Sequence, residues 1–388
     1  MLSRHFLLLA ALFFSFQSIA QNQFTLSGYV KDAETGETLI AANVVNAENP
    51  AQGTTTNTYG FYSFTLPEGN YKISFSYLGF QDQTFEVDLS KNTELNVDLS
   101  EGVTIDEVVI SAEKEARRNN VEGTQMGTLE LPVENIKKLP AIFGEVDILK
   151  TIQLLPGVLS SGEGNAGFYV RGGGPDQNLV LLDEATVYNS GHMLGFFSVF
   201  NADAIKNTTL IKGGMPANYG GRLSSVLDIQ MKEGNNKKYQ VEGGIGLVSS
   251  RLTAQGPIVK DKSSFIISGR RTYVVDLAQP AIENTDFAGT NYYFYDLNTK
   301  VNYQFSNKDR VYFSGYFGRD VFGAGLGIGF DWGNTTTSLR WNRIFSNRLF
   351  LNTTVYYSDY DYALNFGDVD QPLYCIQRAS QVMSDHAY

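Results

Sequence analysis

The sequence predicts a mainly β protein with three parts: an N-terminal β-sandwich, a compact α+β domain, and the first strands of a transmembrane antiparallel β-barrel. Three observations predict this fold class. Tyr, Phe and Gly are abundant, whereas only 18% of the 388 residues are charged, below the roughly 25% of soluble domains. Short runs of alternating polarity recur between turn signals. After Tyr239 the runs lengthen to about ten residues, the length of a membrane-spanning strand.

The numbers of charged residues, cysteines and histidines exclude several classes of function. With 30 basic and 41 acidic residues, the net charge of -11 argues against binding nucleic acid by neutralising phosphates. A single cysteine, Cys375, excludes a disulfide framework and a Cys-based metal site. The three histidines, His5, His192 and His386, are too few for a His-rich metal centre. We therefore expect no metal and no cofactor.

Residues 1–20 have the pattern of a secretory signal peptide. Arg4 precedes an apolar run that is shorter than the about 20 residues of a bilayer-spanning helix, and a small residue ends the segment. An N-terminal anchor helix is the alternative. Gln21, where a lipoprotein would have Cys, argues against lipidation. No later stretch reaches 18 apolar residues, so a chain that crosses a membrane must cross it as strands.

Residues 23–100 are expected to form the sandwich, because short β-like runs alternate there with turn signals. In the run from Tyr71 to Tyr77, aromatic and aliphatic residues alternate with Lys and Ser, which gives one buried and one wet face. Residues 101–128 hold a small apolar cluster followed by charged residues. This composition predicts an extended linker.

Residues 129–235 are expected to form the α+β domain. Helical spacing ends at Pro or Gly in "PVENIKKLP" and "EVDILKTIQLLPGV". Strands between Gly-rich turns are predicted in "FYVRGGG", "NLVLLDEATVY", "AIKNTTLIKGG" and "VLDIQMK".

Residues 236–372 are expected to form about six strands of a partial barrel. In the run 296–305, Leu, Val, Tyr and Phe share one face, and Asp, Asn, Lys and Gln share the other. Short connections in "IVKDK", "SNKD" and "SNR" alternate with long ones at 279–291 and 318–333, as in outer-membrane barrels. A soluble sandwich, which also alternates, is the alternative. Residues 373–388 lose the alternation and are expected to be an irregular tail.

Two segments resemble known families. About a hundred residues, from "LLPGVLSSGEGN" to "VLDIQMK", resemble the plug domain of TonB-dependent outer-membrane receptors. The segment with "GYVKDAETGETLIAANV" resembles the carboxypeptidase regulatory-like domain, a carbohydrate-binding-like fold that often precedes the plug in receptors of Bacteroidetes-type bacteria. The resemblance implies a plug inside a barrel of about twenty-two strands in the cell outer membrane, with the N-terminal domain in the periplasm.

The resemblance also implies partners. A TonB box before the plug would pair with a TonB-type energy transducer of the inner membrane by adding a strand to its sheet. The candidate box in the linker is Ile105, Asp106, Glu107, Val108, Val109, Ile110, Ser111 and Ala112. A last strand of the sandwich is the alternative for this segment. The other implied partners are outer-membrane lipid, an unknown nutrient ligand and a surface lipoprotein; nucleic acid is not expected.

Several plug residues match motifs of the family and are given structural roles. They are Arg171, Gly172, Gly173, Asp183, Lys212, Gly213, Tyr219, Gly220 and Arg222. We expect Arg171 to pair with carboxylates of the barrel wall or plug, and Arg222 to face the barrel interior. Glu184 stands where the family usually has Gly, which puts the turn after Asp183 in doubt.

About six strands cannot close a barrel around a plug, since open edges in lipid leave backbone groups unpaired. The expectation is therefore a truncated or frame-disrupted receptor. A natural barrel of six to eight strands would have no room inside for the plug.

No catalytic constellation is expected. His192 has Ser190 and Ser198 nearby, but no nucleophile elbow surrounds either serine. The predicted function is energised nutrient uptake by an outer-membrane receptor. The alternatives are a non-transporting envelope interaction protein or adhesin, and a signal-transducing receptor.

Overall fold

A computed structural model describes residues 22–102, 127–138, 145–162, 165–285, 287–324, 328–347, 349–366 and 373–387. The predicted signal peptide and the candidate TonB box lie outside the described residues. The chain divides into two compact units. The first is built mainly from residues 38–102 and the strand that precedes them, and the second contains residues 127–345 and 349–387.

The first unit is a β-sandwich, as predicted. One sheet has the order β4-β1-β7, with β8 also pairing with β1, and the other has the order β3-β2-β5-β6. Ile73 and Phe75 are fully buried, whereas the alternate residue Lys72 is exposed. The strands are β1 (Gln23–Asp32), β2 (Asn43–Asn46), β3 (Asn49–Thr55), β4 (Phe61–Pro67), β5 (Gly69–Ser76), β6 (Gln83–Leu89), β7 (Thr93–Glu94) and β8 (Val97–Leu99).

The second unit begins with the α+β domain, whose main sheet has the order β13-β12-β17-β16-β9. Only the β12–β17 pair is parallel. Both predicted helices are present and short. The elements are β9 (Thr128–Pro132), α3 (Val133–Ile136), α4 (Ile148–Ile152), β10 (Val158–Ser160), β11 (Phe168–Val170), η1 (Pro175–Gln177), β12 (Asn178–Leu182), β13 (Ala185–Thr186), β14 (Gly191–His192), η2 (Met193–Gly195), β15 (Phe197–Ser198), β16 (Ile205–Ile211) and β17 (Ser225–Met231).

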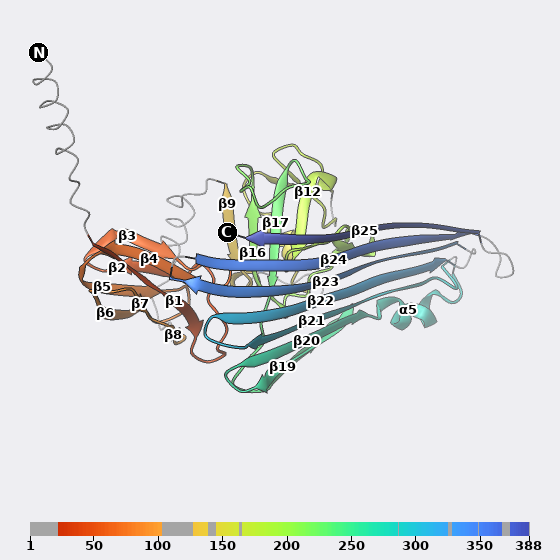
Figure 1. The fold of residues 1–388 in the computed structure, drawn as a ribbon. Helices are drawn as coiled ribbons and strands as arrows, with labels where there is room; N and C mark the ends of the chain where they lie inside the picture. Colours follow the sequence, from red (N-terminus) through yellow and green to blue (C-terminus); the bar gives the residue numbers. More distant parts are fainter. Residues whose placement is uncertain are drawn as a thin grey trace, which may run out of the picture. The chain divides into compact units, whose positions relative to one another are not determined.

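The rest of the second unit is one antiparallel sheet of eight strands in sequence order, called the long sheet below. In Figure 1 its strands run across those of the α+β domain. Helix α5 (Val274–Ile282) lies in one of the two predicted long connections. The strands are β18 (Gln240–Ile245), β19 (Ser249–Val259), β20 (Ser263–Thr272), β21 (Asn291–Gln304), β22 (Asp309–Ala324), β23 (Ile328–Ser346), β24 (Leu349–Phe366) and β25 (Leu373–Ala387).

Three predictions about this sheet are wrong. The range 236–372 holds seven strands, β18 to β24, not about six. The segment 318–333, expected to be a long connection, is mostly strand, because β22 extends to Ala324 and β23 begins at Ile328. The expected irregular tail forms β25, which pairs with β24 from Phe366↔Leu373 onward. The reason is common to all three: a ladder joins backbone groups, so Gly-rich or weakly alternating sequence can still pair with a strong neighbouring strand.

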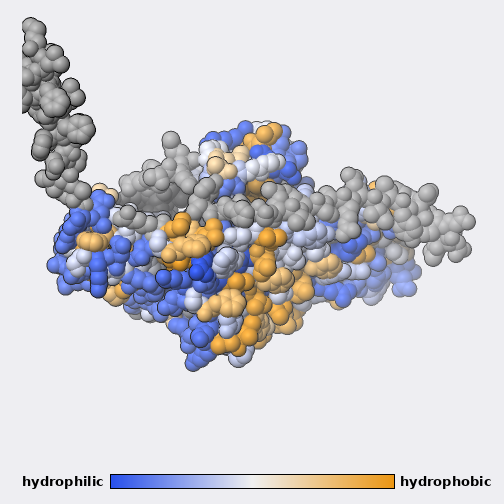
Figure 2. Space-filling view, in the orientation of Figure 1, coloured by the Kyte–Doolittle hydropathy of each residue, from blue (hydrophilic) through white to orange (hydrophobic). Residues whose placement is uncertain are grey.

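The two faces of the long sheet differ as predicted. On β21, Asp296, Asn298 and Lys300 are buried against the α+β domain, whereas Leu297 is 47% exposed on the opposite face. Figure 2 shows hydrophobic residues gathered across this outer face. None of the helices in the described part of the chain has the length and apolar content needed to span a bilayer.

Candidate functional site

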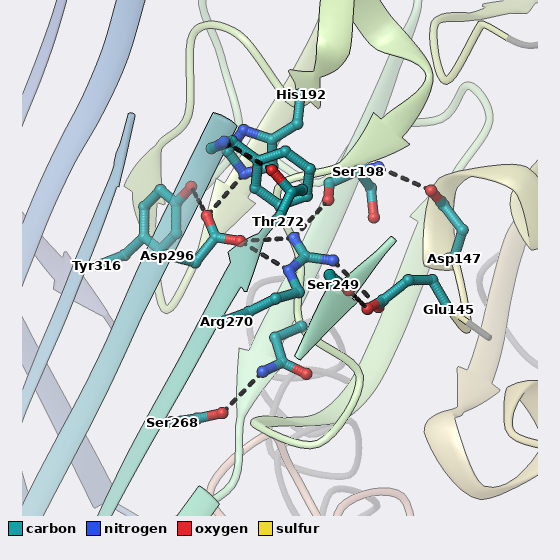
Figure 3. Close-up of polar contacts among 12 residues, drawn as sticks. Glu145, Asp147, His192, Ser198, Ser249, Ser268, Arg270, Thr272, Asp296 and Tyr316 are labelled. Carbon is teal, nitrogen blue, oxygen red and sulfur yellow. Dashed lines mark hydrogen bonds and ion pairs between the residues drawn. The ribbon is translucent and has the colours of Figure 1, made fainter. Parts of the chain in front are cut away.

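Buried charges join the α+β domain to the inner face of the long sheet. The centre of this contact is His192, at the end of β14, which lies between the carboxylates of Asp296 and Asp320 of the sheet. Figure 3 shows its contact with Asp296. Its Nε2 is 2.7 Å from Oδ1 of Asp296, and its Nδ1 is 2.5 Å from Oδ2 of Asp320. The imidazole also stacks on Phe294, with ring centroids 4.1 Å apart. Two strands of the sheet thus hold one side chain of the α+β domain by charge and by ring contact.

The protonation state of His192 follows from this environment. Burial by itself would lower the pKa of His192, but the carboxylates of Asp296 and Asp320 outweigh burial and raise the pKa to about 9. At neutral pH the ring is therefore an imidazolium, and both nitrogens donate. Because carboxylates engage both nitrogens, neither is available to activate a serine. His192 is therefore not placed to act as a catalytic base. It is the only histidine whose side chain the structure describes.

Arg270 of β20 extends the same network. Its Nε and Nη2 donate to Oδ2 of Asp296 at 2.8 and 2.6 Å, and Nη2 also donates to the Ser198 carbonyl at 2.8 Å. Its Nη1 lies 3.5 Å from Glu145 of the α+β domain. Asp296 accepts a further bond from the Tyr316 hydroxyl at 2.8 Å. Asp296 is 3% exposed, and its carboxylate is saturated by donors from both parts of the interface.

A second ionic contact surrounds the turn between β12 and β13. Lys300 of β21 donates to Asp183 at 2.9 Å, and Ser314 donates to the same carboxylate at 2.5 Å. Arg340 of β23 lies 3.2 Å from Glu184. Asp183 is buried, which alone would raise its pKa, but Lys300 and Arg340 hold the pKa of this carboxyl below its usual range.

The same turn resolves the doubt about Glu184. Asp183 and Glu184 form a two-residue hairpin turn, and both have positive φ, 45° and 73°. Left-handed backbone favours Gly, and a non-Gly residue held there carries strain. The turn keeps its geometry because both of its carboxylates are bound by cations of the long sheet.

The third ionic contact and a nearby carboxyl complete the interface. Asp203 of the α+β domain lies 2.6 Å from Arg251 of β19 and 3.2 Å from Lys137. Asp228 of β17 accepts a bond from the Tyr219 hydroxyl at 3.2 Å. Burial and the negative charge of Glu184 raise the pKa of Asp228 to about 6. The interface therefore contains three sets of buried ion pairs, beside an apolar cluster in which Phe197 of the α+β domain packs with Phe294 and Trp332 of the long sheet.

The predicted motif residues lie apart from these contacts, except for Asp183 and Tyr219. Arg171 has a positive φ of 50° and is exposed; among the described residues, no ion pair joins it to a carboxylate, so the expected pair is not found. Arg222 donates to the Gly221 carbonyl at 2.9 Å, a bond within the α+β domain. Lys212 donates to the Pro156 carbonyl at 2.5 Å.

Three of the four motif glycines shape turns. Gly172 and Gly213 have positive φ, and a Cβ on Gly213 would meet the Arg171 guanidinium. Gly173 forms a bridge with Val170. Gly220 lies in open space, where a Cβ would meet nothing.

Sequence reasoning missed the pairing of His192 with Asp296 and Asp320. The sequence does contain a signal that such partners exist: charged residues occupy positions that face inward on the long strands. Such residues need partners when a domain covers them, because a buried charge without a partner is costly.

Metal chemistry has no visible basis in the part of the chain that the structure describes. No group of three His, Cys, Asp or Glu side chains there could hold a metal ion. The clustered carboxylates are instead bound by Arg, Lys and the His192 imidazolium.

Two family models match the chain. Residues 26–110 match the CarboxypepD_reg-like domain, and residues 103–225 match the TonB-dependent Receptor Plug Domain. The chain carries a TonB-dependent receptor plug domain. The plug is the α+β domain described above, and the long sheet is the surface on which it is held. Both models include residues 105–110, which belong to the candidate TonB box.

One curated relative and several solved structures are similar to parts of this chain. TonB-dependent receptor P3 from Formosa agariphila is 31% identical over 101 residues, which are 26% of this chain and 10% of that protein. The siderophore receptor PirA from Acinetobacter baumannii has a similar fold, with a TM-score of 0.51, 16% identity, and coverage of 70% of this chain and 45% of that one. The ferric enterobactin receptor PfeA from Pseudomonas aeruginosa matches at a TM-score of 0.49 and 16% identity, with 70% and 46% covered.

The chain thus spans about a tenth of the curated relative and less than half of PirA. Within that span, a β domain is followed by a plug and then by a sheet that resembles the start of a barrel. This is the predicted order.

Proposed function

We propose that the chain is part of an outer-membrane TonB-dependent receptor that imports a nutrient by energised transport, and that it is not an enzyme. The observation that carries this proposal is the set of buried ion pairs between the plug and the inner face of a sheet whose outer face is apolar. Lipid would cover the apolar face, and its backbone groups are paired within the sheet. The inner face would hold the plug.

The chemistry of that interface suits a plug that has to move. Desolvation offsets much of the attraction in a buried ion pair, so such contacts position a domain without adding much net stability. Water can take over the hydrogen bonds of the separated groups. An interface of the same area made of apolar side chains would expose hydrophobic surface on separation, at a cost of about 25 cal/mol per Å².

The energy for this movement would come through the TonB box. We propose that Ile105–Ala112 adds a strand to a sheet of a TonB-type transducer, with the N-terminal sandwich in the periplasm. The nutrient ligand and a surface lipoprotein remain proposed partners; the lipoprotein rests on the family resemblance alone. The roles given above to the plug motif residues are part of the same proposal.

The decisive experiment measures binding of the transducer. Val109→Pro removes a backbone donor from the middle of the candidate box and should abolish co-purification with the periplasmic domain of the transducer. Ala116→Pro places the same residue in the same linker outside the box and should leave binding intact. Equal binding by both variants would reject Ile105–Ala112 as the box, and absence of binding by the unmodified chain would reject energy coupling.

A further inference from the structure

The connections at the two ends of the long sheet carry opposite charges. Consecutive strands are antiparallel neighbours, so the connections alternate between the ends. One end, called the short-turn end below, has the connections 260–262, 305–308 and 347–348. These contain four basic residues and one acidic residue, which are Lys260, Lys262, Lys308, Arg348 and Asp261. The connections at the other end contain no basic residue and five acidic ones, which are Asp276, Glu283, Asp286, Asp368 and Asp370.

Arg343, near the end of β23, lies on the outer face at the short-turn end. Inner and outer positions alternate along this strand, so that Asn342 is buried whereas Trp341 is 39% exposed. The guanidinium of Arg343 lies beside two aromatic rings of the same face. Its Cζ is 5.9 Å from the ring centroid of Trp341 and 5.1 Å from that of Phe345. A cation among aromatic rings at the edge of an apolar face suits the boundary between hydrocarbon and lipid headgroups.

The positive charge of Arg343 is only partly neutralised. Its Nη1 donates to Oδ1 of Asp309 at 2.9 Å, and its side chain remains 41% exposed. The same carboxylate also accepts from the Trp341 indole at 3.3 Å and from the Ser306 hydroxyl at 3.0 Å. Asp309 therefore divides its charge among three donors. The described residues provide no hydrogen-bond partner for Nη2 of Arg343.

The arginines of the outer face at the other end are matched by more carboxylates. Arg319 of β22 lies between Asp331 and Asp361 and forms an ion pair with each. Arg271 of β20 is 3.9 Å from Asp276 of helix α5. Within the described outer face, positive charge thus exceeds negative charge at the short-turn end and not at the other.

An apolar strip leads from Arg343 along the outer face. The next outer residue after Trp341 is Leu339, which pairs with Phe313 of β22, and both side chains are about half exposed. A lipid with its headgroup at Arg343 would lay its acyl chains on this strip. Because the strip is open to the acyl chains of any lipid, selectivity has to come from the headgroup.

We propose that the short-turn end of the outer face binds the phosphate of an anionic glycerophospholipid, with Arg343 and Lys308 as its cationic partners. Nη2 of Arg343 would donate to a phosphate oxygen. Lys308 is exposed in the adjoining turn, and its carbonyl accepts from Ile344, the neighbour of Arg343. A zwitterionic headgroup would bring its own cation to a basic site, so a headgroup without a cation is favoured. The proposal rests on the proposed function, in which lipid covers this face.

The test uses Trp341 as a reporter of the lipid beside Arg343. The chain has two tryptophans, so Trp332→Phe leaves Trp341 as the only one. This whole chain is placed in mixed micelles of phosphatidylglycerol and phosphatidylcholine in equal amounts, and only one of the two lipids carries brominated acyl chains. Bromine quenches indole fluorescence at short range. We expect stronger quenching by brominated phosphatidylglycerol, with about a fivefold preference, as one basic residue near a membrane surface gives.

Two further substitutions in this reporter chain locate the site. Arg343→Gln should bring the quenching by the two lipids close to equality. Arg271→Gln is the matched control, because Arg271 is also an exposed arginine beside an aromatic ring, with Tyr293 at 5.4 Å, but at the opposite end of the sheet. This variant should keep the preference. The net charge of -11 repels anionic lipid as a whole, so a preference would arise locally.

A salt titration of the reporter chain needs no variant at Arg343 and decides the question if Arg343→Gln does not fold. The preference should fall as the salt concentration rises, because salt screens exposed charges. A preference that salt does not change, equal quenching by the two lipids, persistence in Arg343→Gln, or equal loss in Arg271→Gln would overturn the proposal. Absence of quenching by either brominated lipid would show that lipid does not cover this face, and would also reject the membrane placement in the proposed function. The two failures are therefore distinguishable.

Discussion

The imidazole of His192 lies 2.7 Å from the carboxylate of Asp296, although 104 positions separate the two residues in the chain. One belongs to the plug and the other to the sheet that holds it. Asp296 also accepts two hydrogen bonds from Arg270, so a single carboxylate joins a cation of the plug to a cation of the long sheet. This three-charge contact makes the plug interface sensitive to pH and to single substitutions.

The plug contact should weaken as pH rises through about 9. The folded-state pKa of His192, about 9, lies above its ordinary value of 6.5. A raised pKa means that the stabilisation is fully present below about 6.5 and is lost as pH rises through the folded pKa. Limited proteolysis of the plug between pH 7 and 10 should therefore speed up near pH 9. In His192→Gln, which has no titrating ring, that step should be absent; a step that persists would assign the titration to another group.

Loss of Asp296 should release the plug more than loss of an aspartate outside this network. Asp296→Asn leaves His192 and Arg270 buried without their shared counter-charge, a kind of change that typically costs about 3–5 kcal/mol. Asp361→Asn is the matched control, since Asp361 is a partly exposed partner of Arg319, and such pairs contribute about 0–1 kcal/mol. Amide hydrogen exchange in β12 and β17 measures both. Equal protection in the two variants would show that the network does not hold the plug.

The strain in the β12–β13 turn can be separated from its ion pair. Glu184→Ala and Glu184→Gly both remove the contact with Arg340, but only Gly is free of strain at a φ of 73°. We expect Glu184→Gly to be about 1 kcal/mol more stable than Glu184→Ala, measured by denaturant unfolding of the plug. The reverse order would mean that the turn relaxes out of the left-handed region when its carboxylate is removed.

The sequence predicted the order of the domains and the polarity of the two sheet faces, because strand alternation reports directly which residues share a face. Asp296 and Lys300 were placed correctly on the inner face by this rule. Their partners His192 and Asp183 were not predictable, since the pairing depends on how the plug docks and not on any local pattern. The prediction of an irregular tail failed at β25, whose sequence carries little alternation. The neighbouring strand β24 supplies the hydrogen bonds that define β25.

The N-terminal sandwich should fold without the rest of the chain. Residues 22–102 contain both of its sheets and a continuous core that includes Tyr62, Phe75 and Leu89. Expressed alone, this segment should show β-type circular dichroism and one cooperative melt. Phe75→Ala empties the centre of that core, where Tyr62 packs edge-on at 5.4 Å, and should cost about 3–5 kcal/mol.

Leu78→Ala serves as the control for the sandwich, because Leu78 is 42% exposed and its truncation leaves no enclosed cavity. Its midpoint should stay within a few degrees of the unmodified domain, whereas Phe75→Ala should be largely unfolded at 37 °C if the domain has the usual stability of about 5–15 kcal/mol at its lower end. Similar midpoints for the two variants would show that residues 22–102 do not form the core on their own. The sandwich would then depend on the second unit for its fold.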